Sequence, residues 1–428
     1  MHYYLQCKVC KKEFAGNSGY YQCPQCGGKL EIKYVSLPQA KHVFDIADPS
    51  KRGLWKYWRL LPIDNVGNGL SLGEGDTFLH YCEAIARMYG FRKLWLKDEG
   101  TNPTGSFKDR NACVSVTKAK ELGAQRVAIA SDANAGPSVA AYAAKAGLPC
   151  YVFMPTSTVV TRIAQASLFG ANIIRIEAKG LVSDCIDLVE NLKPYFNWHH
   201  LTTAGPVNPY QLEAPKTIAY EIAIDLDGVM PDWIVAPAGG GGLIVGLFKG
   251  FNELAQMGLI NHVPKFCCVQ SVSCAPIVKA FTEKTNIQKW EDPKPTVAVP
   301  IAVPLPLEGE EVLQVLQETD GVAISVTDEE ILKTQKILAK TEGILASPTG
   351  VSALVGAIKA REQDFIREKD TVVVVITETG LKDLGQMATQ LQVPTLPADL
   401  EVIKDFLLND VGEGGGKECV KQTRGANR

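Results

Sequence analysis

The sequence predicts an α/β protein built on parallel sheets that carry helices on both faces. From residue 106 onward, segments of helical length alternate with short apolar segments of strand length. Strands separated by such helices form βαβ units, which give parallel sheets. Residues 371–376 are a continuous β-branched run, typical of a strand buried on both faces. A chain of 428 residues suffices for roughly two to three domains.

Two cysteine pairs lie within residues 1–35. Cys7 and Cys10 form one C-x₂-C pair, and Cys23 and Cys26 form the other. Four thiolates in two such pairs match the tetrahedral coordination of zinc, and a segment this short needs a metal to fold. Because all four ligands come from the protein, we expect a structural zinc site in a zinc-ribbon-like segment. The alternative is four unligated cysteines in a loop.

A polar turn at residues 97–107 precedes a helix expected at 106–123. Lys108 lies at the start of this helix, two residues before Arg110. Helix N-terminal amides and a neighbouring cation both disfavour a charged amine, so we expect a lowered pKa for Lys108. Such a lysine is a nucleophile suited to forming a Schiff base. The alternative is an ordinary surface lysine.

Beyond Lys108 the alternation continues along the chain. Helices are expected at 134–147, 158–170, 181–192, 217–224, 243–257, 327–342 and 350–361. Strands are expected at 126–130, 149–154, 172–177, 233–236, 266–269 and 371–376. The proline-rich segment 295–306 is expected to be a surface loop, and the glycine-rich end beyond residue 410 to be disordered.

Four glycines, Gly239, Gly240, Gly241 and Gly242, connect the strand at 233–236 to the next helix. Glycines at this position let the backbone approach an anion closely, and the helix N-terminus offers N–H groups and the positive end of a dipole. We therefore expect a phosphate here. The alternative is a flexible turn, although four glycines cost chain entropy.

Asn134 and Thr377 follow two of the expected strands, at the carboxyl ends where open α/β sheets bind ligands. Asn134 either caps its helix or offers its amide to a ring hydroxyl. Thr377 either simply ends its strand or faces an uncharged pyridine nitrogen. Together with the Lys108 amine and the glycine run, these groups fit one ligand, pyridoxal phosphate.

Composition and motifs exclude several other classes of protein. The formal charge of −3 gives no electrostatic reason for nucleic-acid binding. The N-terminus lacks a signal-peptide pattern, and no apolar run reaches the roughly 18 residues that span a bilayer. Neither the dinucleotide-binding nor the P-loop glycine motif is present. We expect a soluble, cytoplasmic enzyme that acts on a small molecule.

Four motifs resemble those of threonine synthases, which belong to the tryptophan-synthase-β-like fold of pyridoxal-phosphate enzymes (PLP fold type II). They are S-L-G-E-G-D-T-F-L at 71–79, N-P-T-G-S-F-K-D at 102–109, N-P-Y-Q-L-E with K-T at 208–213 and 216–217, and T-E-T-G-L-K-D at 377–383. The N-terminal cysteine pairs also occur in many members of that family. The resemblance covers about residues 1–390.

The resemblance implies two open parallel-sheet domains and a role for each candidate residue. The large domain comprises 36–111 and 196–395, the small domain 112–195 and the C-terminal tail 396–428. Lys108 would hold the cofactor, Asn134 its ring oxygen, Gly239 to Gly242 its phosphate and Thr377 its pyridine nitrogen. The implied reaction converts O-phosphohomoserine and water into threonine and phosphate, and the implied assembly is a homodimer.

Several residues depart from the threonine synthase pattern. Gln211 stands where those enzymes usually have an arginine for the substrate phosphate, so a bidentate phosphate partner is lost. Ala133 and Glu378 replace glycines, Ala214-Pro215 replaces Gly-Gln, and the four-glycine run resembles that of serine/threonine dehydratases. Two alternatives therefore stay open: a β-elimination or β-replacement enzyme acting on serine, threonine or a related amino acid, and a non-catalytic relative that binds the cofactor.

Overall fold

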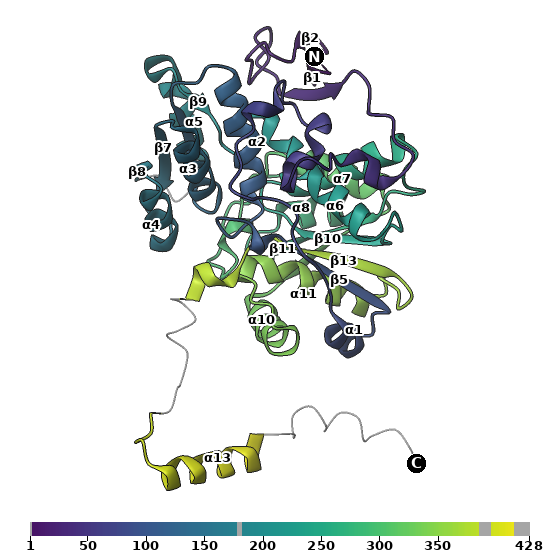
Figure 1. The fold of residues 1–428 in the computed structure, drawn as a ribbon, viewed down its shortest axis with the longest axis vertical. Coiled ribbons are helices and arrows are strands. Elements are labelled where there is room, and N and C mark those ends of the chain that lie inside the picture. The colour runs from purple at the N-terminus through teal and green to yellow at the C-terminus, as the bar shows by residue number, and fades with distance from the viewer. Residues whose placement is uncertain (1, 178–181, 385–394, 415–428) are drawn as a thin grey trace. The chain divides into compact units, whose positions relative to one another are not determined.

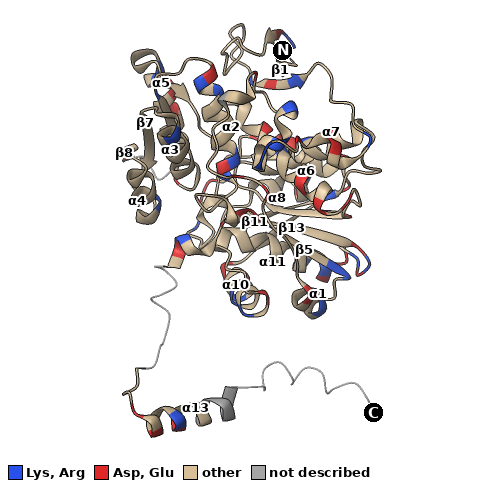
Figure 2. Ribbon diagram, viewed as in Figure 1, with Lys and Arg blue, Asp and Glu red and all other residues tan. Residues whose placement is uncertain are grey.

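The computed structural model describes residues 2–177, 182–384 and 395–414. The chain divides into two compact units, Met1–Asp383 and Leu384–Arg428. The described residues of the first unit form three sheets, with helices packed on the two larger ones (Figure 1). Acidic and basic residues are interspersed along its helices (Figure 2).

The N-terminal sheet is small and antiparallel. Its central strand β1 (Tyr3–Cys7) pairs with β2 (Glu13–Ala15) on one side and β3 (Leu30–Tyr34) on the other. Alternate residues of β1 are buried, as expected for a strand with one face on a core. The short 3₁₀ helices that follow are η1 (Val43–Ile46), η2 (Gly53–Leu60) and η3 (Val66–Asn68).

The largest sheet has the strand order β12-β11-β10-β13-β5-β4. Its strands are β12 (Val322–Val326), β11 (Lys265–Ser271), β10 (Trp233–Pro237), β13 (Thr371–Ile376), β5 (Lys93–Asp98) and β4 (Leu79–Tyr81). All neighbours are parallel except β4, which is antiparallel to β5. Val372 and Val374 pack into one core while Val373 and Val375 pack into another, so β13 is buried on both faces as predicted.

The second parallel sheet has the order β8-β7-β6-β9. Its strands are β8 (Asn172–Ile176), β7 (Cys150–Pro155), β6 (Val127–Ala130) and β9 (His199–His200). Helix α3 contacts β6 and β7, and α5 contacts the same two strands and β9. Val127 and Ile129 belong to one core and Ala128 and Ala130 to another, so this sheet is also covered on both faces.

Helices α6, α7 and α9 pack on one side of the large sheet, and α10 and α11 on the other. In the first unit the helices are α1 (Glu83–Tyr89), α2 (Lys108–Glu121), α3 (Ala135–Ala146), α4 (Val160–Leu168), α5 (Val182–Phe196), α6 (Lys216–Asp225), α7 (Gly242–Gln256), α8 (Pro276–Glu283), α9 (Gly309–Glu318), α10 (Asp328–Glu342) and α11 (Pro348–Glu362). Further 3₁₀ helices are η4 (Glu99–Thr101), η5 (Pro209–Glu213), η6 (Val299–Ile301) and η7 (Gly380–Asp383).

The second unit contains helix α13 (Leu400–Gly414). The expectation of disorder beyond residue 410 is wrong up to Gly414, because the apolar and charged residues from 400 onward favour a helix that continues into the first glycines. Residues 415–428 lie outside the described part of the chain. Among the described residues, no helix has the length and apolar composition needed to cross a membrane.

The predicted elements between 126 and 376 are confirmed to within a few residues, and β13 matches its predicted bounds. The proline-rich segment 295–306 holds only the single turn η6. Between 126 and 376, helices α8 and α9 and strands β9 and β12 were not predicted. The α/β fold class is confirmed, and the domain boundaries stay a prediction.

Candidate functional site

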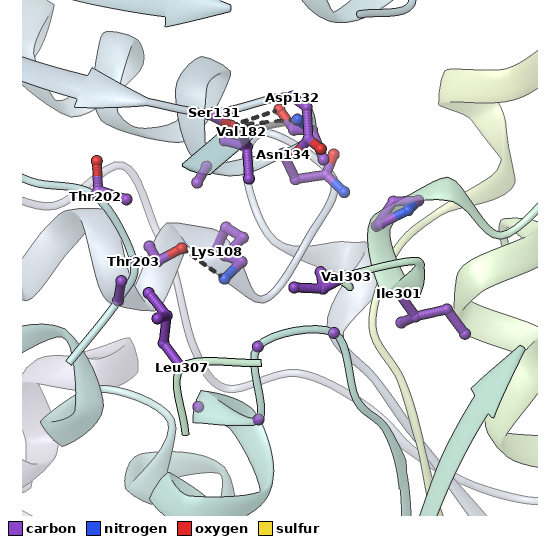
Figure 3. Close-up of a pocket in the computed structure, with 18 of the residues that line it drawn as sticks. Lys108, Ser131, Asp132, Asn134, Val182, Thr202, Thr203, Ile301, Val303 and Leu307 are labelled. Atoms are coloured by element: carbon purple, nitrogen blue, oxygen red, sulfur yellow. Dashed lines mark hydrogen bonds between the residues drawn. The ribbon is translucent and has the colours of Figure 1, made fainter. Parts of the chain in front are cut away.

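A cavity of about 430 Å³ is lined by every residue predicted to contact the cofactor. Lys108, Asn134, the four glycines and Thr377 all line it, although they come from segments far apart in the sequence. They lie at the carboxyl ends of β6, β10 and β13 or at the N-termini of the helices that follow β5, β6 and β10. Figure 3 shows Lys108 and Asn134 among the side chains that line this cavity.

Lys108 begins α2, and its Nζ donates a hydrogen bond to Thr203 Oγ1 at 3.0 Å (Figure 3). Burial lowers its pKa to about 8, against the opposing pull of the Glu308 and Asp132 carboxylates. The predicted direction is therefore confirmed, but the predicted cause is wrong. Desolvation disfavours the Lys108 ammonium. Arg110 is not the cause, because its charge is balanced by its own carboxylate partners.

Arg110 holds the first turn of α2 in place without lining the cavity itself. Its guanidinium is fully buried and bonds both oxygens of Glu99 and both oxygens of Glu221, at 2.6–2.8 Å. It also meets the hydroxyls of Thr217 and Thr77 at 3.0 and 3.2 Å. A guanidinium held by this many hydrogen bonds fixes the backbone two residues from Lys108.

The glycine turn exposes backbone where side chains would not fit. A Cβ at Gly239 would lie 2.6 Å from the carbonyl oxygen of Pro300, and Gly241 has φ of +100°. Gly242 is the first residue of α7, so the turn leads directly into free helix N–H groups. This arrangement fits a phosphate, as the sequence predicts.

Thr377 follows β13 and is 3% exposed. Its Oγ1 has no hydrogen-bond partner among the described residues, although it lines the cavity. A buried hydroxyl without a partner is unfavourable unless a ligand supplies one. A pyridine nitrogen would do so. The next residue, Glu378, does have protein partners: it pairs with Arg162 from α4 and accepts a hydrogen bond from Ser347 Oγ at 3.1 Å.

Asn134 makes no side-chain cap on α3, so the capping alternative is wrong. Its Oδ1 accepts a hydrogen bond from Lys382 Nζ at 2.6 Å. Because the carbonyl oxygen is occupied, only the amide nitrogen can donate to a ligand. This nitrogen also hydrogen-bonds Glu378, which leaves its second proton for a ligand, and the side chain lies at the cavity (Figure 3). Burial lowers the pKa of Lys382 to about 8.

Sequence reasoning missed Thr203, Glu308, Lys289 and the role of Lys382. Lys382 lies within the quoted T-E-T-G-L-K-D motif, so a signal for it was available. Thr203 and Glu308 reach the cavity from irregular segments without a recognisable pattern. Glu308 accepts a hydrogen bond from the Gly205 N–H, and its own N–H donates to the carbonyl oxygen of Gly240 at 2.9 Å.

The residues present fit pyridoxal phosphate. A partly deprotonated amine, an unpaired hydroxyl, an amide donor and a phosphate-sized glycine turn surround one cavity. Each group matches a different part of the cofactor: aldehyde, ring nitrogen, ring oxygen and phosphate.

The N-terminal cysteines form a second, separate cluster. The sulfurs of Cys7, Cys10, Cys23 and Cys26 all lie within 4.8 Å of one another. Cys7 and Cys26 are 3.5 Å apart and Cys10 and Cys23 3.7 Å, close to the roughly 3.8 Å separation of tetrahedral thiolates on zinc. A Cβ at Gly28 would lie 3.0 Å from the Cys7 sulfur, so a larger residue there would crowd the cluster.

Residues 70–378 match the family model described as "Pyridoxal-phosphate dependent enzyme". The chain is 37% identical over 409 residues to a threonine synthase of Methanosarcina acetivorans, covering 95% of this chain and 98% of that protein. It is 36% identical over 407 residues to a threonine synthase of Methanocaldococcus jannaschii, covering 94% and 98%.

Two solved structures share the fold at low sequence identity. A maize serine racemase has a TM-score of 0.62 and 19% identity, over 73% of this chain and 92% of that one. A serine racemase from Dictyostelium discoideum has a TM-score of 0.59 and 20% identity, over 71% and 92%.

Proposed function

Since the chain belongs to the family of pyridoxal-phosphate dependent enzymes, and within it to the threonine synthases, we propose that it converts O-phosphohomoserine and water into threonine and phosphate. The enzyme is thus a pyridoxal-phosphate dependent lyase of fold type II that acts on a small amino acid. The observation that carries the proposal is identity of 36–37% to threonine synthases over nearly the whole chain.

The bound cofactor supplies the electron sink that makes the α-proton of an amino acid acidic. Lys108 would hold the cofactor through its Nζ, and its free amine would be the base that moves the α-proton of the substrate. Its pKa near 8 keeps a useful fraction of the amine uncharged at neutral pH. The Thr203 hydroxyl, 3.0 Å away, orients the Nζ.

The remaining lining residues bind and orient. Gly239 to Gly242 and the N-terminus of α7 hold the cofactor phosphate, and Asn134 donates to the ring oxygen. Thr377 meets the pyridine nitrogen with a neutral hydroxyl, which leaves that nitrogen uncharged and favours elimination over transamination. Two observations support these roles: all of these residues line one cavity, and Thr377 Oγ1 has no other hydrogen-bond partner among the described residues.

Lys289 is the cation we propose for the substrate phosphate. Among the described residues, Lys108 and Lys289 are the two cationic side chains that line the cavity. Because Lys108 is committed to the cofactor, Lys289 is left to balance a phosphate ester. Lys289→Ala should raise KM for O-phosphohomoserine more than it lowers kcat, whereas Lys294→Ala on the same loop should change neither.

A substrate panel tests the function. Purified enzyme loaded with cofactor should release phosphate and threonine from O-phosphohomoserine in equal amounts. Release of keto acid from serine or threonine, without phosphate release from O-phosphohomoserine, would instead support the dehydratase alternative that the glycine run and Gln211 motivate. An absence of turnover with every substrate would contradict both activities.

We also propose that Cys7, Cys10, Cys23 and Cys26 hold a structural zinc ion. We propose too that the enzyme is cytoplasmic and, as the resemblance implies, a homodimer. The clustered sulfurs support the metal. Metal analysis of the purified protein should find one zinc per chain, and none in a Cys10→Ser, Cys26→Ser variant. Light scattering should give twice the mass of one chain.

A further inference from the structure

Gln211 presents an unpaired donor beside the glycine turn. It lies in η5, is 1% exposed and lines the same cavity as Lys108. Its Nε2 has no hydrogen-bond partner among the described residues. A buried amide N–H without a partner is destabilising, and a hydrogen-bond acceptor bound in the cavity would satisfy it.

The orientation of this amide follows from its neighbour Asn111. The backbone carbonyl of Gln211 accepts a hydrogen bond at 2.7 Å from the Asn111 side chain, so the atom that donates must be the Asn111 Nδ2. The same Nδ2 lies 3.0 Å from the Gln211 side-chain amide and must meet its oxygen, Oε1. Reversing either amide would place two donors or two acceptors against each other.

The donor that remains is therefore fixed beside the phosphate turn. A Cβ built on Gly242 would lie 3.5 Å from Gln211 Nε2, nearer than to Oε1 at 3.7 Å. Gly242 opens α7, whose first N–H groups also need acceptors. The amide nitrogen and the helix N-terminus thus offer hydrogen bonds to the same small volume.

We propose that Gln211 donates from Nε2 to the phosphate of pyridoxal phosphate, oriented for this purpose by Asn111. The residue at this sequence position is therefore a cofactor-binding residue in this chain rather than a replacement for an arginine that holds the substrate phosphate. The substrate phosphate is left to Lys289 at the cavity lining. The inference rests on the proposed cofactor site and not on the identity of the amino-acid substrate.

The test compares two aldehydes that differ only in the phosphate. Apoenzyme is titrated with pyridoxal phosphate and with pyridoxal, following absorbance, for the wild type, Gln211→Leu and Gln211→Glu. Loss of a hydrogen bond to a charged group should weaken pyridoxal phosphate binding roughly 10- to 100-fold in Gln211→Leu. Pyridoxal should bind within about twofold of the wild type.

Gln211→Glu keeps the oxygen that Asn111 needs but sets an anionic oxygen against the phosphate. We expect a larger loss of pyridoxal phosphate affinity than in Gln211→Leu, again with pyridoxal little changed. The phosphorus-31 resonance of the bound cofactor should shift in both variants.

Unchanged pyridoxal phosphate affinity with a raised KM for O-phosphohomoserine would overturn the proposal and assign Gln211 to the substrate. Equal losses for both aldehydes would also overturn it. Because the affinities are measured without substrate, a chain with a different substrate would leave this result unaffected.

Discussion

Replacing Arg110 by leucine is the clearest test of how the fold positions Lys108. The substitution removes a buried cation, and Glu99 and Glu221 lose the guanidinium that pairs with their carboxylates. These two side chains are 0% and 3% exposed. Breaking a buried ion pair from one side costs about 3–5 kcal/mol because a charge is left uncompensated. Two carboxylates share Arg110, so the loss should reach the upper part of that range.

The pH dependence of this loss identifies its cause. Although burial alone would raise the pKa of Glu221, Arg110 and Lys97 hold it well below its usual range. A carboxyl with a depressed folded-state pKa stabilises the protein above its unfolded pKa of about 4.3, and this stabilisation is lost at lower pH. Without Arg110 the Glu221 carboxylate can be neutralised by protonation. The deficit of Arg110→Leu should therefore be largest near neutral pH and should narrow as the pH falls towards 5.

Urea unfolding of the apoenzyme, at neutral and mildly acidic pH, measures the deficit. Arg87→Leu is the matched control, because Arg87 forms an exposed ion pair with Glu83 one helical turn away, at 2.7 Å. Such pairs contribute about 0.3–0.5 kcal/mol. The reasoning is refuted if Arg110→Leu loses no more stability than Arg87→Leu, or if its deficit grows on acidification.

Three further predictions concern the cavity and the cysteine module. Thr377→Val should weaken cofactor binding up to about tenfold yet leave apoenzyme stability unchanged or higher, since Oγ1 has no described partner to lose. Thr217→Val is the control: the Thr217 hydroxyl donates to Ala214 O at 2.7 Å, so its loss should destabilise the apoenzyme. The rate at which pyridoxal phosphate is captured covalently should rise with pH as the Lys108 amine loses its charge. It should level off above about pH 9, because burial lowers the pKa of Lys108 to about 8. A rate still rising at pH 10 would contradict this. Removing the proposed zinc ion should weaken cofactor binding by freeing Lys29, which donates to Glu311 at 2.7 Å and lies 4.0 Å from Glu308 at the glycine turn. Lys29→Met should lose this dependence on the metal.

The parts of the site that the sequence revealed are those written in short, contiguous patterns. The glycine run, the lysine turn and the strand-end Thr377 each carry a local signature, and the alternation of helices and strands predicts that their loops meet at the carboxyl edges of the sheets. Helix α9 was missed because no element was predicted for residues 309–318, although the buried Val312, Val315 and Leu316 have helical spacing.

Tertiary burial was beyond the reach of local patterns. The lowered pKa of Lys108 arises from desolvation by the whole cavity, so the predicted helix and Arg110 effects gave the right direction for the wrong reason. Glu308 and Thr203 reach Lys108 from distant irregular segments. The unpaired nitrogen of Gln211 depends on a contact with Asn111, 100 residues away in sequence.

The identity of the lysine that carries the cofactor tests the central claim most directly. Two lysines near the cavity, Lys108 and Lys382, have pKa values lowered to about 8, so low pKa alone does not choose between them. Reducing the loaded enzyme with borohydride makes the link permanent, and peptide mass spectrometry then locates it. We predict that the cofactor mass is found on Lys108 and is absent from Lys108→Ala. Label on Lys382, or label spread over several lysines, would contradict the account.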